Sequence, residues 1–289
     1  MKKILLSAII SAFVANMHAQ FNNQPEHKIG IVLSGGGALG FAHIGALQAL
    51  EEQGIRPTIV AGASMGALVG VFYANGYTPS QIYEIVKHEK FDNVLNIVVP
   101  IIKHQKLGLS SQKNILKMLK KYINHNSFGS LRYPLYVSIT NLTTGKVEYV
   151  SSGENLSSVV LASAAIPVVF EAVKIDGNIY VDGGVLNNLP AQPVNEKCKY
   201  LIGINVKPDY EFKKANSFWG ILLRSMQLII SENAKEGENM CDILIKPKSN
   251  RKYDEFSFKA FEEIYQDGYN EMKNYLDANP QMVEKLTKQ

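Results

Sequence analysis

A serine between two glycines carries the first chemical signal in the sequence. Gly62-Ala63-Ser64-Met65-Gly66 fits the pattern G-x-S-x-G, and it lies between an expected strand and an expected helix. The flanking glycines leave room for a sharp turn that would expose the hydroxyl near the positive end of the helix dipole. Ser64 is therefore a candidate nucleophile, and the alternative is a serine that only caps the helix.

A glycine-rich loop, Gly35-Gly36-Gly37-Ala38-Leu39-Gly40, also lies between an expected strand and an expected helix. Its converging N–H groups suit either a dinucleotide pyrophosphate or the oxyanion of an acyl transfer. A dinucleotide site requires an acidic residue about 20 residues further on, at the end of the next strand. That strand leads instead into Ser64, so nucleotide binding is not the favoured interpretation.

A third motif, Asp182-Gly183-Gly184, follows a short expected strand at 179–181. A hydroxyl nucleophile needs a base, and an aspartate followed by two glycines can approach it closely. The alternative is a turn-forming Asp-Gly pair, which is common in proteins.

The histidines argue against a Ser-His-Asp triad. The six histidines are His18, His27, His43, His88, His104 and His125. An α/β-hydrolase triad runs in the order Ser, acid, His, and few acids lie between Ser64 and the last histidine. The base is therefore expected to be another residue, and His43 is expected to be a packed helix histidine. No histidine clusters with Cys or acidic residues at ligand spacing, so no metal site is predicted.

Strands and helices alternate along the first ninety residues, which predicts an α/β domain with a mostly parallel sheet. Hairpins are expected at 135–151 and 173–181, a long helix at 219–234 and a closing helix at 257–276. The chain has no internal repeat and no linker. One domain, roughly 26–280, is the simplest interpretation.

The first residues resemble a targeting segment. Lys2 and Lys3 precede an uncharged apolar run at 4–14, which is too short to span a bilayer, and Ala19 precedes an expected cleavage point. Residues 1–19 are thus predicted to be a signal peptide, and the alternative is a short N-terminal anchor helix. The protein is expected to be exported, either to the periplasm or out of the cell.

Composition limits the classes of partner. Hydrophobic residues make up 46% of the chain and charged residues 19%, as in packed globular proteins. The formal net charge is only +4, which argues against electrostatic nucleic-acid binding. The two cysteines, Cys198 and Cys241, either pair or remain free thiols.

Two segments allow a structural or a lipid-related interpretation. The apolar run at 94–102 is either a core segment or a hydrophobic lip where lipid chains enter. A basic group beside His104 is either a solvated face or a contact with anionic lipid. That group consists of Lys103, Lys106, Lys113, Lys117, Lys120 and Lys121.

Together, the three motifs resemble the patatin-like phospholipase family. The run His43-Ile44-Gly45-Ala46-Leu47 and the segment 162–167 also match, and the resemblance covers about 28–275. It implies a three-layer α/β/α sandwich and a Ser–Asp dyad without histidine. Carried over by position, Ser64 is the nucleophile and Asp182 the base, and the oxyanion donors are backbone amides within Gly36, Gly37 and Ala38.

The resemblance implies hydrolysis of a lipid ester or membrane phospholipid. No cofactor is expected, and neither a nucleotide nor a nucleic acid is an expected partner. The sequence departs from the family at Leu39, where the glycine loop often carries Arg or Lys. This departure leaves open a non-catalytic exported module that binds a lipid or a partner on the same scaffold. Nucleotide binding is the third alternative. The sequence does not indicate an oligomeric state.

Overall fold

The protein is described by a computed structural model that covers residues 27–89, 112–167, 169–207, 218–248 and 252–288. The predicted signal peptide at 1–19 and the apolar run at 94–102 lie outside the described residues. So do Lys103, His104 and Lys106 of the basic group.

A central sheet has the strand order β5-β6-β3-β2-β1-β7-β8, and β4 pairs with β3. The β1–β2, β2–β3, β1–β7 and β7–β8 pairs are parallel, whereas β4, β5 and β6 join through antiparallel pairs. The strands are β1 His27–Leu33, β2 Ile59–Ala63, β3 Leu135–Asn141, β4 Lys146–Val150, β5 Val173–Ile175, β6 Asn178–Asp182, β7 Cys198–Ile204 and β8 Ile243–Ile245.

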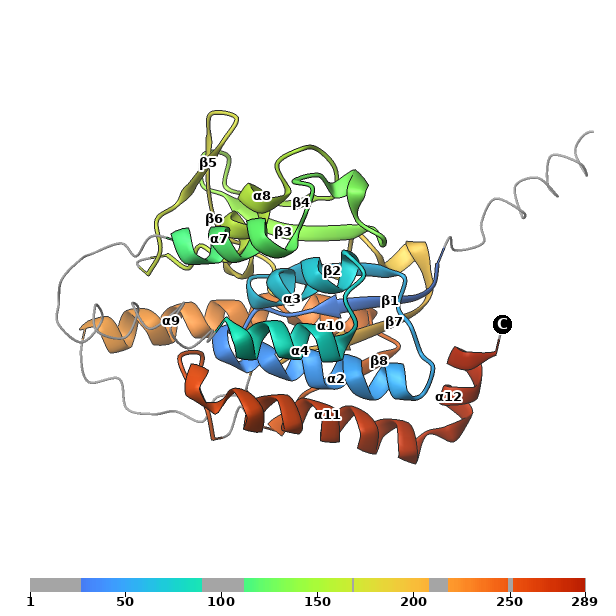
Figure 1. The fold of residues 1–289 in the computed structure, drawn as a ribbon. Coiled ribbons are helices and arrows are strands. Elements are labelled where there is room, and N and C mark those ends of the chain that lie inside the picture. The colour runs from blue at the N-terminus through green and yellow to red at the C-terminus, as the bar shows by residue number, and fades with distance from the viewer. Residues whose placement is uncertain (1–26, 90–111, 168, 208–217, 249–251, 289) are drawn as a thin grey trace, which may run out of the picture.

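Helices cover both faces of this sheet (Figure 1). The α-helices are α2 Phe41–Glu52, α3 Met65–Ala74, α4 Pro79–His88, α7 Lys113–Tyr122, α8 Leu156–Ser163, α9 Phe218–Asn233, α10 Lys235–Met240, α11 Phe261–Ala278 and α12 Pro280–Thr287. Short 3₁₀ turns include η1 Gly37–Gly40, η3 Gly183–Val185 and η6 Phe258–Ala260. None of the helices in the described ranges is both long enough and apolar enough to cross a bilayer.

Alternation along β1 explains why two layers of helices are needed. Ile31 and Leu33 belong to the large core that includes α2, α3, α8 and α11, whereas Val32 packs into a smaller core on the other face. A strand that is apolar on both sides must be covered on both sides. The three-layer α/β/α architecture and the mostly parallel sheet that the sequence predicts are thereby confirmed.

Most predicted elements are present, with shifted ends. The strand expected before the G-x-S-x-G motif is β2, which runs to Ala63, directly before Ser64. Thr78 begins α4 with a capping box that it forms with Gln81, which explains the sharp helix start. The sequence analysis did not anticipate α12, which begins at Pro280 directly after the predicted closing helix.

Candidate active site

Ser64 occupies a strained turn between β2 and α3. Its φ and ψ angles are 53° and −122°, so a non-glycine residue lies in the left-handed half of φ space. The turn is tight because α3 passes directly over the end of β1. A Cβ atom at Gly66 would collide with the carbonyl oxygen of Leu33. The flanking glycine is thus required by a close backbone approach.

The sheet brings Asp182 to Ser64 through a shared edge of β3. On that edge β2 runs parallel to β3 and ends with Ala63 opposite Ser138. On the same edge β6 runs antiparallel to β3 and ends with Asp182 opposite Ile139, because β4 occupies the other edge. The carboxyl ends of two strands that run toward each other therefore meet, and Ser64 and Asp182 line one cavity.

Asp182 is buried, with 6% of its surface exposed. Its Oδ1 accepts the N–H of Gly184 at 2.8 Å. Burial raises the pKa of its carboxyl to about 6, and hydrogen bonds from Ser64 and Gly184 and the charge of Lys207 oppose that rise. The carboxyl is consequently mostly ionised at pH 7 yet more basic than an ordinary aspartate.

A second serine fixes the backbone of the turn. Ser64 donates its N–H to Oγ of Ser163 at 2.9 Å, and that hydroxyl donates to the carbonyl oxygen of Ser138 at 2.7 Å. All three residues are buried. The sequence analysis quoted the 162–167 segment but gave Ser163 no role. The signal that could have found it is a serine between alanines at the end of a buried helix.

Backbone hydrogen bonds hold the glycine loop, but two of its N–H groups do not take part in them. Gly35 donates to the carbonyl oxygen of Asn188 at 3.2 Å, and Ala38 donates to that of Glu255 at 2.9 Å. The N–H groups of Gly36 and Gly37 have no acceptor among the described residues. Both glycines line the cavity with Ser64. The Ala38 amide, which the family resemblance included among the oxyanion donors, is already occupied.

The other motif glycines lie where segments of the site touch. A Cβ atom at any of them would come within 3 Å of an atom from a neighbouring segment; they are Gly35, Gly40, Gly62, Gly183 and Gly184. A Cβ atom at Gly35 would lie 2.9 Å from Cβ of Ser64. The glycine loop and the serine turn therefore pack directly against each other.

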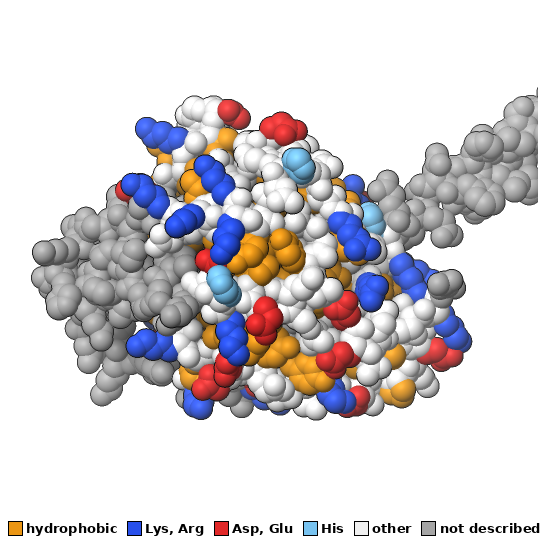
Figure 2. Space-filling view, in the orientation of Figure 1, with side chains coloured by type: hydrophobic (Ala, Val, Ile, Leu, Met, Phe, Trp, Pro, Cys, Tyr) orange, Lys and Arg blue, Asp and Glu red, His pale blue; other side chains and the backbone are white. Residues whose placement is uncertain are grey.

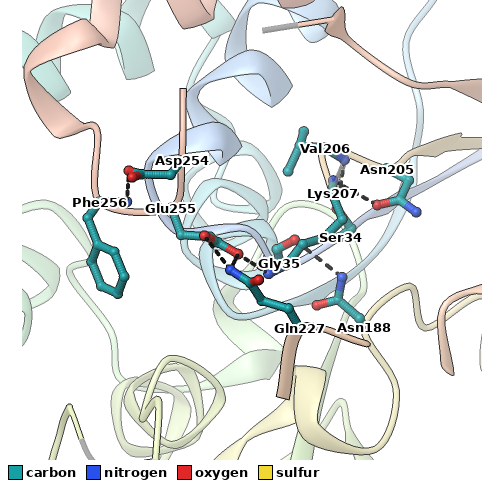
Figure 3. A network of polar contacts seen from close by, with 10 residues as sticks. All are labelled: Ser34, Gly35, Asn188, Asn205, Val206, Lys207, Gln227, Asp254, Glu255 and Phe256. Carbon is teal, nitrogen blue, oxygen red and sulfur yellow. Dashed lines mark hydrogen bonds and ion pairs between the residues drawn. The ribbon is translucent and has the colours of Figure 1, made fainter. Parts of the chain in front are cut away.

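A polar network supports the glycine loop from residues far along the chain (Figure 3). Val206 donates its N–H to Oγ of Ser34 at 3.0 Å. Lys207 and Glu255 form a buried ion pair with Nζ and Oε1 2.6 Å apart. Gln227 of α9 donates to the same carboxylate at 3.4 Å. None of these residues was singled out from the sequence, since neither their types nor their spacing indicates a site.

His43 is a packed helix histidine with a fixed tautomer. It is fully buried, and Nε2 lies 2.8 Å from the carbonyl oxygen of Ser34. A carbonyl oxygen only accepts, so Nε2 carries the proton, and Nδ1 has no partner within the described part of the chain. Burial lowers the pKa of His43 to about 4, so the ring is neutral at pH 7. Its contact holds the residue directly before the glycine loop.

Two cavities meet at Ser64. One is almost entirely apolar, and its walls include Leu68, Ile115, Phe170 and Phe258. The other also has apolar walls, such as Met226 and Ile230, but it contains the polar residues Asp182, Asn188 and Lys207. Ser64 and Gly37 line both. A bound molecule at Ser64 would thus have apolar walls on both sides, with most of the polar groups in the second cavity.

A sequence model described as patatin-like phospholipase matches residues 31–195, more than half of the chain. The chain belongs to the patatin-like phospholipase family. Membership in this family favours the acyl-transfer interpretation of the glycine loop over the dinucleotide interpretation.

Known proteins similar to this patatin-like chain are mostly longer. Lysophospholipase NTE1 of Kluyveromyces lactis is 30% identical over 276 residues, which cover 83% of this chain and 18% of the yeast protein. An uncharacterized NTE family protein of Mycobacterium bovis is 32% identical over 167 residues, which cover 58% of this chain and 45% of that protein. The matched part therefore covers less than half of either relative.

A solved structure shares the patatin-like fold. VipD from Legionella pneumophila superposes with a TM-score of 0.50 at 18% sequence identity, and the match covers 89% of this chain and 68% of the VipD chain. At this identity the likeness concerns the fold alone.

Leu39 does not reach the site of this patatin-like chain. It is fully buried and belongs to the large hydrophobic core. The nearby cation is Lys207, whose charge acts on Asp182. The position at which the family often has a cation is therefore a core position here, and the positive charge beside the dyad comes from a different segment.

The remaining sequence-based expectations concern the cysteines and the basic group. Cys198 and Cys241 are both free thiols. The lysines of α7 are exposed, and Nζ of Lys121 pairs with Oε1 of Glu89 at 2.6 Å. On the face seen in Figure 2, basic side chains are interspersed with acidic ones. The described lysines are therefore exposed, and both the solvated face and the contact with anionic lipid stay open as interpretations.

Proposed function

We propose that this protein hydrolyses acyl esters of lipids, with Ser64 as nucleophile and Asp182 as general base. The observation that carries the proposal is the meeting of β2 and β6 on one edge of β3, which places both side chains in one cavity with two available backbone amides. A serine paired with a base and facing oriented N–H donors is the arrangement that acyl transfer requires.

In the first half-reaction Ser64 Oγ attacks the ester carbonyl carbon, and Asp182 takes the hydroxyl proton. The negative charge on the carbonyl oxygen is stabilised by the N–H groups of Gly36 and Gly37, each worth about 3 kcal/mol. The bond from carbon to the alcohol oxygen then breaks, and Asp182 returns its proton to the leaving alkoxide. An acyl group remains on Ser64.

In the second half-reaction water attacks the acyl carbon, and Asp182 takes one of its protons. The bond to Ser64 Oγ breaks, Asp182 gives the proton back to the serine, and a carboxylic acid is released. The raised pKa of Asp182 suits this work, because an ordinary aspartate is too weak a base for a hydroxyl.

The two cavities support one orientation of the substrate at Ser64. The acyl chain lies in the apolar cavity beside Leu68 and Phe170, and the alcohol part lies toward Asn188 and Lys207. The yeast relative is named a lysophospholipase, which supports lysophospholipids as candidate substrates alongside diacyl phospholipids.

The direct test is fatty-acid release by the full chain from lysophosphatidylcholine, phosphatidylcholine vesicles and a short-chain nitrophenyl ester. Ser64→Ala and Asp182→Asn should each reduce turnover at least about a thousandfold while the fold is retained. Ser130→Ala, which alters an exposed serine outside the cavities, is the matched control. Turnover that survives in Ser64→Ala would contradict the assignment.

Covalent labelling separates an enzyme from a binding module on the same scaffold. A fluorophosphonate should label Ser64 in the wild-type protein and leave the Asp182→Asn variant nearly unlabelled, because an unactivated serine reacts slowly. An unlabelled, folded wild-type protein would favour the non-catalytic alternative.

The rate should also follow the ionisation of Asp182. Only the ionised carboxylate accepts a proton, so kcat/KM for the soluble ester should rise with a midpoint near the pKa of about 6 and level off above it. A pH–rate profile between pH 4 and 9 measures this midpoint. A flat profile would contradict Asp182 as the base.

The proposal extends to export. The basic and apolar pattern of residues 1–19 supports a cleavable signal peptide. Expression of the full chain in a Gram-negative host, followed by fractionation and N-terminal sequencing, tests it. Recovery of uncleaved protein in the cytoplasm would contradict it.

A further inference from the structure

The surface of α9 is unusual for its exposed large hydrophobic side chains. Ile221, Leu228 and Ile229 are 57%, 54% and 56% exposed, and Phe218 at the first turn is 73% exposed. At 100° per residue these four positions fall within an arc of about 100°. The exposed polar residues Ser225 and Glu232 lie within the same arc. We define the four hydrophobic side chains, together with Leu186, as the α9 apolar face.

The neighbouring arc of the same helix lines the cavity that contains Asp182. Met226, Gln227 and Ile230 are among the cavity walls, together with Ser64 and Asp182. Leu186, which is 39% exposed, directly follows η3 and the Asp182 motif. The α9 apolar face therefore borders the cavity that contains the proposed dyad.

Hydrogen bonds fix α9 to both halves of the site. Asn233 donates to the carbonyl oxygens of Gly184 and Val185 at 3.0 Å each, and its Oδ1 accepts the N–H of Asn188 at 2.9 Å. At the middle of the helix, Gln227 contacts the Glu255 carboxylate. The apolar face consequently has a fixed position relative to Ser64. Figure 1 shows α9 extending past the end of the sheet.

The size of the face limits what can cover it. With roughly 100 Å² from each of five side chains, the patch measures about 500 Å². A stable dimer of standard size buries about 800 Å² on each partner. A lipid surface sets no such minimum, because an amphipathic helix can rest its apolar side about 5–10 Å into the headgroup region.

We propose that the α9 apolar face docks this protein on a phospholipid surface, with the cavity mouth turned toward the lipid. This inference rests on the proposed function, because a lipid ester must pass from an aggregate into the cavity at Ser64. Docking through a helix that borders the cavity shortens that path and exposes the acyl chain to apolar side chains rather than to water.

The test uses the full chain carrying Ser64→Ala, so that the vesicles are not consumed. We expect it to float with phosphatidylcholine vesicles, and Leu228→Glu with Ile229→Glu to weaken vesicle binding at least about tenfold. The matched control is Leu142→Glu with Ile179→Glu, which alters two other exposed hydrophobic residues, 55% and 39% exposed, on the antiparallel hairpins. The control should bind like the parent.

A second measurement separates this inference from the proposed function. With Ser64 restored, the Leu228→Glu and Ile229→Glu variant should hydrolyse the soluble ester within about twofold of wild type and lose most of its activity on vesicles. If the wild-type protein does not hydrolyse the soluble ester, the proposed function is contradicted. The docking inference is not contradicted by that result, because flotation is measured without catalysis.

Four outcomes would overturn the docking inference. The first is unchanged flotation of the α9 variant, and the second is absence of flotation in the parent. The third is a wild-type dimer, seen by light scattering, that the α9 substitutions dissociate, since a second copy would then cover the face. The fourth is binding to anionic vesicles alone that is reversed by about 0.5 M salt, at which the Debye length is about 4 Å. That result would replace apolar docking with charge attraction.

Discussion

The serine turn and the glycine loop both join a parallel strand to a helix, yet they are held in different ways. The serine turn depends on backbone clearance at Gly66 and on one side-chain contact with Ser163. The glycine loop depends on Asn188, Val206 and Glu255, which lie 150 residues or more further along the chain. The nucleophile is therefore positioned largely by its own turn, and the oxyanion donors are positioned by the second half of the protein.

The difference extends to the family match. The matched range, 31–195, contains Ser64, Ser163, Asp182 and Asn188. Val206, Lys207 and Glu255 lie beyond it. Part of the support of the glycine loop therefore comes from segments outside the range that the family model matches.

Breaking the serine turn should have the largest effect on stability. Gly66→Ala places a Cβ atom against the carbonyl oxygen of Leu33, where backbone cannot easily move. We expect a loss of about 4 kcal/mol or more in the free energy of unfolding, or failure to fold, measured by urea denaturation. The control is Gly129→Ala, whose nearest contact would be Oγ of Ser127 at 3.6 Å. Near-wild-type stability of Gly66→Ala would show that the turn is not sterically fixed.

Breaking the support of the glycine loop should come next. Lys207→Met leaves the Glu255 carboxylate buried without its ion-pair partner, which costs about 3 kcal/mol. The double variant Lys207→Met with Glu255→Gln removes both charges and should recover most of that loss. A double-mutant cycle measures the coupling between the two side chains.

The matched control for the buried pair is an exposed one. Lys273→Met removes the partner of Asp277 on the surface of α11 and should cost less than about 1 kcal/mol. Lys207→Met should also shift the pH–rate midpoint upward, because the Lys207 charge holds the pKa of Asp182 down. An unchanged midpoint would mean that Lys207 supports the structure without acting on the base.

Two buried groups should give opposite pH dependences of stability. The pKa of Asp182 is about 6 when folded and about 4 when unfolded, so its stabilising effect is full below pH 4 and is lost as the pH rises through 6. The pKa of His43 is about 4 when folded and about 6.5 when unfolded, so its contribution is full above pH 6.5 and is lost as the pH falls through 4. The two effects largely cancel between pH 4 and 6.5.

Single variants should reveal how the free energy of unfolding depends on pH through each group alone. Asp182→Asn should raise the free energy of unfolding at pH 8 by about 2 kcal/mol and leave a stability that falls as the pH drops. His43→Gln, whose amide can still donate to Ser34, should give the reverse slope. Urea denaturation across pH 4–8 measures both. Parallel pH profiles for the two variants would contradict this assignment.

The smallest effect on catalysis is expected at Leu39. Because this side chain packs in the core rather than in the cavity, Leu39→Met should change stability by less than about 1.5 kcal/mol and leave kcat and KM nearly unchanged. Leu39→Lys should destabilise the fold instead of supplying a cation to the substrate. A gain of activity in Leu39→Lys would show that the position reaches the site after all.

The sequence by itself determined the elements that carry the motifs. The apolar strands, the glycines around Ser64, the capping residues of α4 and the order of the three motifs depend on local spacing and on steric rules that act between neighbours. The absence of a usable histidine after Ser64 also followed from chain order alone. These features predicted the α/β class and pointed to Ser64 and Asp182 as the candidate residues.

Only the tertiary structure decided how those residues meet and what supports them. The approach of Asp182 to Ser64 depends on two strands running toward each other along β3, and strand direction is not written in local sequence. The bond from Ala38 to Glu255, the roles of Ser163 and Lys207, and the exposure of α9 all join segments far apart in the chain. Such contacts arise from packing, which the types and spacing of nearby residues do not specify.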